Sequence, residues 1–147
     1  MNIKKVLIFG FLIFGISFSN VKDSISQMKI GVALPLMKES ADPEEKRTGQ
    51  QFINGINDAL ADYNAEKPSL KITFAIEDTK RESETTLEIF NKLGTDKNII
   101  AIFGPIYSSD LVNNTGASSF HKIPIVTPTA TANFLAQNSP YLFQLNP

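Results

Sequence analysis

Short apolar runs alternate with longer amphipathic runs through most of the chain. A run of about four to eight apolar residues, rich in β-branched or aromatic side chains, is typical of a strand buried in a sheet. Such runs predict strands at residues 29–36, 71–77, 99–103, 123–126 and 141–145. Pro35 is expected to end the first strand, and Gly104 the third.

The segments between these runs carry apolar residues at helical spacing. In residues 49–64 the apolar side chains fall on one helical face, and they are Phe52, Ile53, Ile56, Ala59, Leu60 and Tyr63. A second helix is predicted from Ser83, as its N-cap, to Gly94, as the residue that stops it. Weaker patterns predict a helix at residues 108–120 and one or two helical turns at residues 132–137.

Strands that alternate with helices of this length predict the α/β class, with a doubly wound parallel sheet and right-handed crossovers. Residues 99–103 are apolar at every position, so we expect this strand to be buried on both faces. In an open sheet of this kind, ligands bind at the carboxyl ends of the strands. The loops that follow the strands are therefore the places where a site is expected.

The first 19 residues have the pattern of an export signal. Lys4 and Lys5 precede an apolar stretch at residues 6–18, and Ser17 and Ser19 stand where signal peptidase accepts small residues. The stretch is too short to cross a membrane, which takes about 20 residues. We therefore expect residues 1–19 to be a cleaved signal peptide and residues 20–147 to be exported to the periplasm. A lipid anchor is not expected, because the chain has no Cys.

Composition narrows the chemistry that the chain can perform. The absence of Cys excludes disulfides, Cys-ligated zinc, iron–sulfur clusters and a cysteine nucleophile. His121 is the single histidine, which makes a His-based triad or a His-rich metal site hard to build. The 14 Lys and Arg residues are balanced by 15 Asp and Glu residues, so no basic field for nucleic acid is expected. The sequence thus predicts a protein that is not an enzyme and has no metal, no cofactor and no nucleic-acid partner.

The loops after the first two predicted strands lack the known phosphate-binding motifs. Residues 35–40 contain no G-x-G-x-x-G, so a dinucleotide-binding turn is absent, and neither a P-loop nor a G-x-S-x-G elbow occurs elsewhere. Asp78 follows the second strand, where a dinucleotide-binding fold would have its ribose-binding acid. Without the glycines, we interpret Asp78 as a carboxylate that holds a turn or caps a helix.

The loops after the third and fourth predicted strands are rich in hydroxyl groups. Residues 104–110 read G-P-I-Y-S-S-D, and residues 127–133 read T-P-T-A-T-A-N. Hydroxyl groups and free N–H groups at the end of a strand suit a carboxylate or another small anion. Two alternatives remain open at this point: Ser108 only caps its own helix, or Thr129 and Thr131 only stabilise a polar turn.

At these two loops the sequence resembles the periplasmic substrate-binding proteins of the branched-chain amino acid ABC transporter family, which have the type I fold. The likeness extends over almost all of residues 20–147. It includes K-I-G-V-A-L-P-L in the first strand, G-Q-Q-F-I-N-G-I-N-D-A-L in the first helix and E-D-T-K after the second strand. It continues through I-I-A-I-F-G-P-I-Y-S-S and I-P-I-V-T-P-T-A-T.

The resemblance implies a two-lobed clamshell that closes on an amino acid-like ligand and delivers it to an ABC permease in the inner membrane. It implies that Ser108 and Thr131 donate from their hydroxyl groups to the ligand's α-carboxylate, and that Thr129 and Ala130 contribute mainly backbone groups. The backbone around Ile106 and Tyr107 lines the same cleft in the family. One departure is Thr48, which stands where family members often have an aromatic residue, and this weakens any expectation of a branched aliphatic ligand.

The length is short for this family, whose second lobe supplies the acid that holds the ligand's ammonium group. The chain ends at Pro147, near the crossover to that lobe, so residues 20–147 are expected to form the N-terminal lobe only. We therefore expect a solute-binding component of an amino acid ABC transporter in truncated form, with only weak binding. The alternative is a sensory or cell-envelope regulatory module that uses the same fold without transport.

Overall fold

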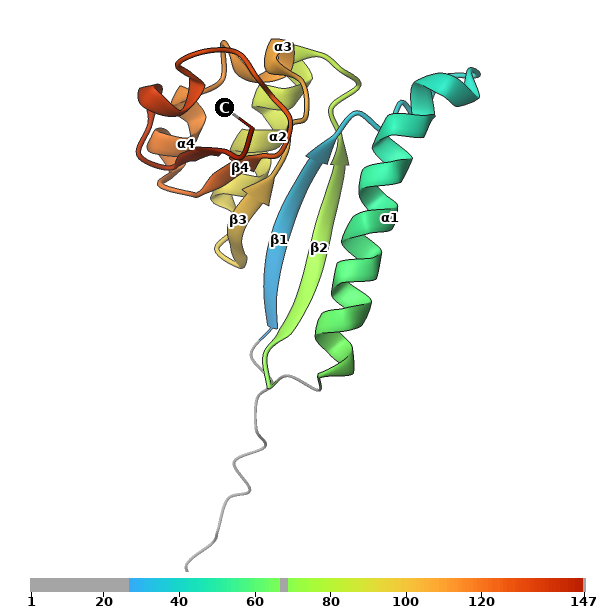
Figure 1. The fold of residues 1–147 in the computed structure, drawn as a ribbon. Coiled ribbons are helices and arrows are strands. Elements are labelled where there is room, and N and C mark those ends of the chain that lie inside the picture. Colours follow the sequence, from blue (N-terminus) through green and yellow to red (C-terminus); the bar gives the residue numbers. More distant parts are fainter. Residues whose placement is uncertain (1–26, 67–68, 147) are drawn as a thin grey trace, which may run out of the picture.

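The computed structural model describes residues 27–66 and 69–146, and the predicted signal peptide lies outside these residues. The protein has the α/β order that the sequence predicts (Figure 1). Its strands are β1 (Gln27–Leu34), β2 (Lys71–Asp78), β3 (Ile99–Phe103), β4 (Ile125–Thr127) and β5 (Leu142–Gln144). Its helices are α1 (Pro43–Ala65), α2 (Ser83–Thr95), α3 (Ser108–Leu111), α4 (Gly116–His121) and the 3₁₀ helix η1 (Leu135–Asn138).

The five strands form one parallel sheet in the order β2-β1-β3-β4-β5. The chain moves outward from β1 to β2 and then returns to build β3, β4 and β5 on the other side of β1. The strand order therefore reverses between β1 and β3, and the loops that leave these two strands diverge at the carboxyl edge of the sheet. Such a switch point is where doubly wound sheets bind ligands.

Helices cover the two faces of the sheet unequally. Alternate side chains of β1 point to opposite faces, so Val32 and Leu34 pack with α1 while Ala33 packs with the other cluster. That second cluster contains Phe90 and Leu93 of α2, together with residues of α3 and α4. Figure 1 shows α1 alone beside β1 and β2, and α2 and α4 together beside β3 and β4. No helix in the described ranges is long and apolar enough to span a membrane.

Helix α1 begins six residues before the predicted start at Gly49, because local signals favour an earlier start. Asp42 is its N-cap and accepts a hydrogen bond from the Glu44 N–H (2.9 Å), and Pro43 occupies the first helical position. Glu44 and Glu45 add negative charge in the first turn. The first turns carry no apolar stripe because they extend beyond the edge of the sheet (Figure 1), so hydrophobic spacing could not reveal them.

The predicted caps of the second helix are wrong. Glu82, not Ser83, is the N-cap, and Ser83 is the first helical residue. Gly94 lies inside α2, which continues to Thr95. A Cβ on Gly94 would overlap the ring of His121, so this glycine permits close packing of α2 against α4 instead of ending the helix.

The helix predicted at residues 108–120 is two short helices, α3 and α4, separated by a turn. Asn114 lies in this turn, and its side-chain amide donates to the backbone carbonyl groups of Asp110 and Ser83 (2.7 Å each). Side-chain bonds of this kind compete with helical backbone bonds. The break therefore depends on a contact with α2, thirty-one residues earlier in the chain.

Strand β3 is not buried on both faces as predicted. Its pairing with β1 shifts register, so that Lys29 pairs with Ile99 and Ile30 with Ala101. Ile100 is left between the two pairs as a bulge, and its side chain is 45% exposed. The fourth strand also lies slightly later than predicted, at Ile125–Thr127.

Candidate functional site

The loops after β3 and β4 are joined by hydrogen bonds at the carboxyl edge of the sheet. The Ser108 Oγ accepts from the backbone N–H groups of Thr131 and Ala132, at 3.0 Å each. The Thr129 Oγ1 donates to the carbonyl oxygen of Ile106 (2.8 Å). The structure therefore brings the two predicted loops together into one arrangement.

These bonds exclude a purely local role for Ser108 and for Thr129. Ser108 does not cap its own helix: Tyr107 is the N-cap of α3, with no side-chain capping bond, and the Ser108 hydroxyl reaches the other loop instead. Thr129 likewise bonds across to Ile106, twenty-three residues away, and not within its own turn. The hydroxyl groups thus serve to join the loops, which a purely local turn would not need.

The hydrogen bonds to Ser108 leave its hydroxyl proton available to donate to a ligand. A hydroxyl oxygen has two acceptor lone pairs and one proton. The two N–H groups occupy the lone pairs, so the proton of Ser108 is what this group can still offer. Ser108 is half-buried, and Thr131 beside it is exposed and carries a second hydroxyl. Two neighbouring O–H donors at a strand edge suit a small anionic or carbonyl group.

The other predicted site residues lie in the same place but differ in access. Tyr107 is half-buried and Thr129 is exposed, whereas Ile106 and Ala130 are buried, with 4% and 1% exposure. The Ala130 N–H donates to Thr127 Oγ1 (3.3 Å), and its carbonyl oxygen accepts from Gln144 Nε2 (2.8 Å). The backbone N–H of Ala130 and one lone pair of its carbonyl oxygen are therefore already used within the loop.

Gln144 is a residue of this edge that sequence reasoning missed. Its amide donates to the carbonyl oxygens of Ala130 (2.8 Å) and Ala132 (3.3 Å), which holds the loop after β4 from the side. Gln144 pairs with Thr127 in the register of β4 and β5, and this pairing places it beside the start of the loop after β4. The sequence alone does not show which strands pair, so it could not reveal this role.

Gly104 sets the path of the loop after β3. Its φ of +98° is a conformation that side chains rarely adopt, and a Cβ there would overlap the carbonyl oxygen of Ala33 on β1. Thr127 reinforces the same turn, because its Oγ1 donates to the carbonyl oxygen of Pro105 (2.7 Å). The prediction that Gly104 ends the third strand is confirmed, and the turn places Ser108 opposite the loop after β4.

Asp78 holds the loop after β1, which confirms its interpretation as a turn carboxylate. Its carboxylate accepts from the backbone N–H groups of Leu36 (2.8 Å), Met37 (3.1 Å), Lys38 (2.9 Å) and Lys80 (3.0 Å). Partial burial would raise the pKa of Asp78, but these four hydrogen bonds outweigh it and lower the pKa below its usual value. A charged Asp78 thus ties the carboxyl ends of β1 and β2 together.

Arg81 and Asp110 flank Tyr107 on the side of α2. The guanidinium of Arg81 lies 4.3 Å from the centre of the Tyr107 ring, a cation–π contact. Asp110 is fully buried, and within the described residues its Oδ2 has no hydrogen-bond partner. Burial raises the pKa of Asp110, and the hydrogen bond from Ser109 (2.9 Å) and the charge of Arg81 offset this only in part.

Asp110→Asn is expected to raise the melting temperature by a few degrees at pH 7. An acid whose pKa is raised by folding favours the folded state only when it is protonated, below its unfolded pKa of about 3.9. Wild-type stability should therefore fall as the pH rises from about 3.9 through the raised pKa of folded Asp110, and asparagine should avoid that loss. Thermal unfolding between pH 3 and 8 measures the difference, with Asp62→Asn on the exposed face of α1 as control. A lower melting temperature for Asp110→Asn at pH 7 would show that the carboxylate is charged and paired.

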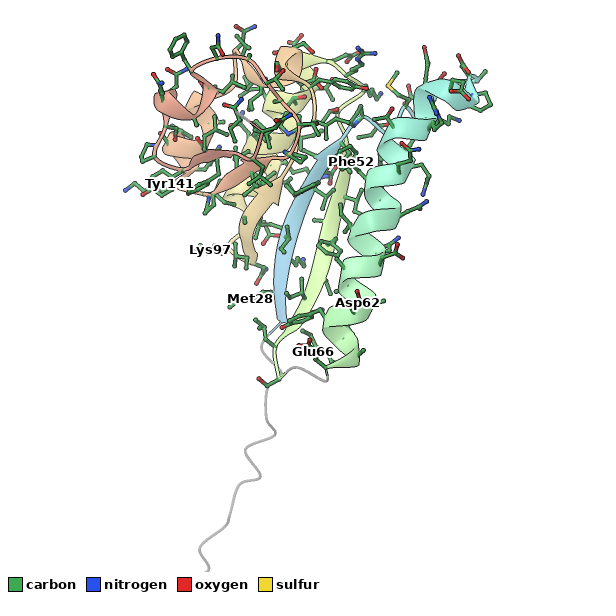
Figure 2. All side chains as sticks on the ribbon, in the orientation of Figure 1. Met28, Phe52, Asp62, Glu66, Lys97 and Tyr141 are labelled. Atoms are coloured by element: carbon green, nitrogen blue, oxygen red, sulfur yellow. The ribbon has the colours of Figure 1, made fainter. Side chains whose placement is uncertain are left out.

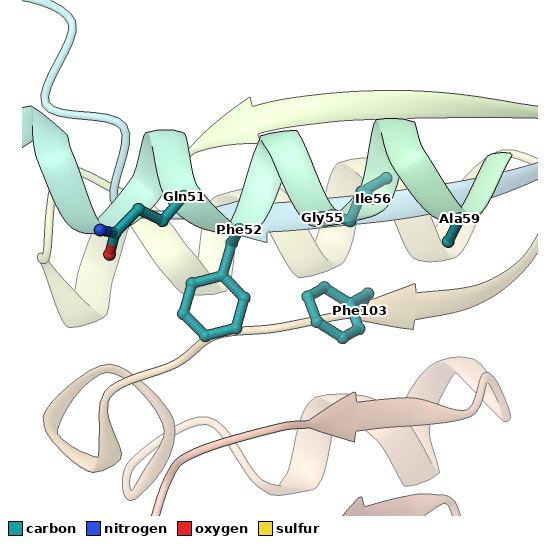
Figure 3. A pocket seen from close by; sticks show the side chains of 6 residues that line it. All are labelled: Gln51, Phe52, Gly55, Ile56, Ala59 and Phe103. Atoms are coloured by element: carbon teal, nitrogen blue, oxygen red, sulfur yellow. The ribbon is translucent and has the colours of Figure 1, made fainter. Parts of the chain in front are cut away.

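A hollow lies away from these residues. A cavity of about 520 Å³ lies between α1 and β3, and the rings of Phe52 and Phe103 line it side by side, with their centres 6.2 Å apart (Figure 3). None of the predicted site residues lines it. In the described part of the chain, no group of three or more His, Cys, Asp or Glu residues is arranged to hold a metal ion.

Comparisons with known proteins place this arrangement in context. The sequence model of the family described as "Receptor family ligand binding region" matches residues 54–147. No curated protein sequence was found to match the chain.

Several solved structures have the same fold. One is the ABC transporter substrate-binding protein from Desulfitobacterium hafniense in complex with Leu, with a TM-score of 0.69 and 20% identity over 81% of this chain and 34% of that one. Another is the branched-chain amino acid transporter substrate-binding protein LivJ from Streptococcus pneumoniae, in complex with isoleucine. Its TM-score is 0.70, and it is 23% identical over 82% of this chain and 34% of that one. A third is a solute-binding protein from R. palustris, in complex with 4-hydroxybenzoate. Its TM-score is 0.68, and it is 18% identical over 81% of this chain and 31% of that one.

These structures confirm the predicted fold class, which is that of the type I periplasmic binding proteins. The chain spans about a third of the length of each of them.

Proposed function

Because the chain belongs to the receptor ligand-binding-region family, we propose that it is the N-terminal lobe of an extracytoplasmic solute-binding component of an ABC transporter. Its ligand in this proposal is an amino acid or a related small carboxylate or amide. The observation that carries the proposal is the pair of N–H bonds from Thr131 and Ala132 to the Ser108 Oγ, which fixes the Ser108 hydroxyl beside the backbone of Thr131 at the carboxyl edge of the sheet. The names of the solved relatives support the class of ligand.

The proposed binding mode follows from the capacity of each group. The Ser108 proton and the Thr131 hydroxyl donate to the ligand's carboxylate, and the loop bonds already hold the Ser108 oxygen and the Thr131 backbone in place. The Thr129 hydroxyl donates its proton to the carbonyl oxygen of Ile106, so Thr129 positions the loop and does not bind the ligand through its side chain. Tyr107 and the backbone of Ile106 form the wall beside the carboxylate, and the buried backbone of Ala130 holds the loop through its bonds to Thr127 and Gln144.

This lobe is expected to bind weakly by itself. Two or three charge-assisted hydrogen bonds contribute about 1.5–3 kcal/mol each. Association costs about 4–15 kcal/mol, and micromolar affinity needs about 8.2 kcal/mol net. Dissociation constants in the millimolar range are therefore expected, and a second lobe would have to supply the remainder.

Export belongs to the same proposal. The signal-peptide pattern of residues 1–19 supports cleavage before Asn20 and release into the periplasm, where a binding lobe meets an ABC permease in the inner membrane.

A sensory or cell-envelope regulatory module with the same fold is the second candidate. Two observations favour it: the matching family is described as one of receptors, and Thr48 stands where an aromatic residue is common in the transport proteins. The gene neighbourhood separates the two candidates, because permease and ATPase genes support transport, whereas a kinase or envelope-enzyme gene supports sensing.

Ser108→Ala is expected to weaken binding of a simple amino acid about tenfold, since one donor to a carboxylate is worth about 1.4 kcal/mol or more. The measurement is a ¹H–¹⁵N NMR titration of the chain with glycine, leucine, acetate and acetamide, in which the amide signals of Ser108, Thr131 and Ala132 should shift. Ser119→Ala is the matched control, because Ser119 bonds to Ser139 away from this edge. The proposal fails if no compound shifts these signals, or if both variants bind as wild type does.

A further inference from the structure

A second hollow lies at the outer edge of the sheet, beside β2 and the first turns of α1. Its volume is about 460 Å³, and it shares no residue with the candidate site. Ile53 of α1, Ile76 of β2 and Leu36 of the loop after β1 supply apolar surface, and Ile76 is 37% exposed. Lys38, Lys46 and the amide of Gln50 line the remainder. The hollow therefore joins an apolar floor to a rim that carries two ammonium groups.

The carboxylates around this hollow already have other partners. Within the described residues neither Lys38 nor Lys46 forms an ion pair, and Lys46 is half-buried. Two nearby acidic side chains form ion pairs, Glu39 with Lys80 (3.0 Å) and Glu44 with Arg47 (2.9 Å). Three others accept hydrogen bonds from neutral groups: Glu45 from Ser40, Asp42 from the Glu44 N–H, and Asp78 from four backbone N–H groups. None of these carboxylates lines the hollow, so the charged groups that face an occupant are the two ammonium groups.

The position of Lys46 in its helix adds to this. Lys46 is the fourth residue of α1, a helix of 23 residues whose N-terminal end carries partial positive charge. A cation in the first turn is unfavourable there, and Lys38 lines the same hollow. A bound anion would interact favourably with both ammonium groups, whereas a cation or a neutral molecule would not.

We propose that this hollow is a binding site for an amphipathic organic anion, such as a short-chain carboxylate. The carboxylate lies between Lys38 and Lys46 and accepts from the Gln50 amide, while the hydrocarbon part covers Ile53 and Ile76. The site is separate from the loop edge that holds Ser108, and it does not depend on the proposed transport function. Its occupant needs an apolar body as well as a charge, because neither half of the hollow alone makes a complete site.

The test is an NMR titration of the full chain with hexanoate and, in parallel, with hexan-1-ol, observing the methyl signals of Ile53 and Ile76. Hexanoate is expected to shift both signals, and Lys46→Gln is expected to weaken its binding at least threefold. Lys97→Gln is the matched control, since Lys97 is an exposed lysine in the turn before β3 (Figure 2). Ile76→Ser should weaken hexanoate binding without changing the charge.

Three results would overturn the proposal. Equal binding of hexanol and hexanoate would show an apolar groove without anion selectivity. Unchanged affinity in Lys46→Gln and Lys38→Gln would remove the cations from the site. Shifts at Ser108 and Thr131 in place of Ile53 and Ile76 would assign hexanoate to the loop edge, and they would leave the proposed transport function intact.

Discussion

Replacing Gly104 by alanine is expected to lower the free energy of unfolding by about 2–4 kcal/mol. The φ of +98° disfavours any side chain, and the new Cβ would overlap the carbonyl oxygen of Ala33, which belongs to the backbone of β1 and cannot turn aside. To relieve the overlap, the loop after β3 must move away from β1. Equilibrium urea denaturation measures the loss.

The matched control is Gly55→Ala in the middle of α1, where a Cβ meets no atom within 4 Å. The same change in chemistry should there stabilise the protein by up to about 1 kcal/mol, because alanine has the higher helix propensity. Opposite signs for the two alanines would show that the cost at Gly104 comes from its conformation and its contact. A loss within about 0.5 kcal/mol of zero at Gly104 would contradict the geometry of this turn.

Gly104→Ala should also disturb the candidate site. Ser108 lies four residues further along the same loop, and its bonds to Thr131 and Ala132 require the loops after β3 and β4 to stay in contact. Movement of the turn should therefore weaken ligand binding beyond the effect expected from global stability. The amide signals of Thr131 and Ala132 report this directly.

The order of elements could be predicted because its signals are local. Apolar runs and helical spacing are properties of neighbouring residues, and they located β1, β2, β3 and α2 to within a few residues. The features that escaped prediction depend on contacts distant in sequence. Asn114 breaks the third helix partly by bonding to Ser83, and the exposure of Ile100 follows from a bulge in its pairing with β1.

The candidate site likewise has features that local sequence could predict and features that depend on distant contacts. Its two loops were predicted because hydroxyl-rich segments follow two strands of one parallel sheet, and parallel strands end at the same edge. The bonds that join Ser108 to Thr131, and the contribution of Gln144, could not be predicted, since they depend on how β4, β5 and α3 are placed in space. Asp78 was interpreted correctly in kind, but its reach to the loop after β1 requires the pairing of β1 with β2.

Asp78→Ala is expected to destabilise the protein by about 2–3 kcal/mol, because four backbone N–H groups lose a charged acceptor. The loss should stay well below four full charge-assisted bonds, since Asp78 is partly exposed and water can replace it at Lys38. The freed loop after β1 should also exchange its amide hydrogens faster at Leu36 and Met37, which hydrogen-exchange NMR can detect.

The pH dependence gives Asp78→Ala a second and independent test. The pKa of Asp78 is lowered in the folded state, so its contribution is fully present above the unfolded pKa of about 3.9 and is lost as the pH falls through the folded pKa. The stability difference between wild type and Asp78→Ala should thus be constant from pH 6 to 8 and shrink below about pH 4. Asp96→Ala is the control: its half-buried carboxylate accepts from one backbone N–H and from the side-chain amide of Asn98, and it pairs loosely with Lys29 (3.7 Å), so the loss of one backbone bond in place of four should have a clearly smaller effect. Equal losses at the two positions, or a difference at Asp78 that persists at pH 2, would show that the four hydrogen bonds do not hold the loop after β1.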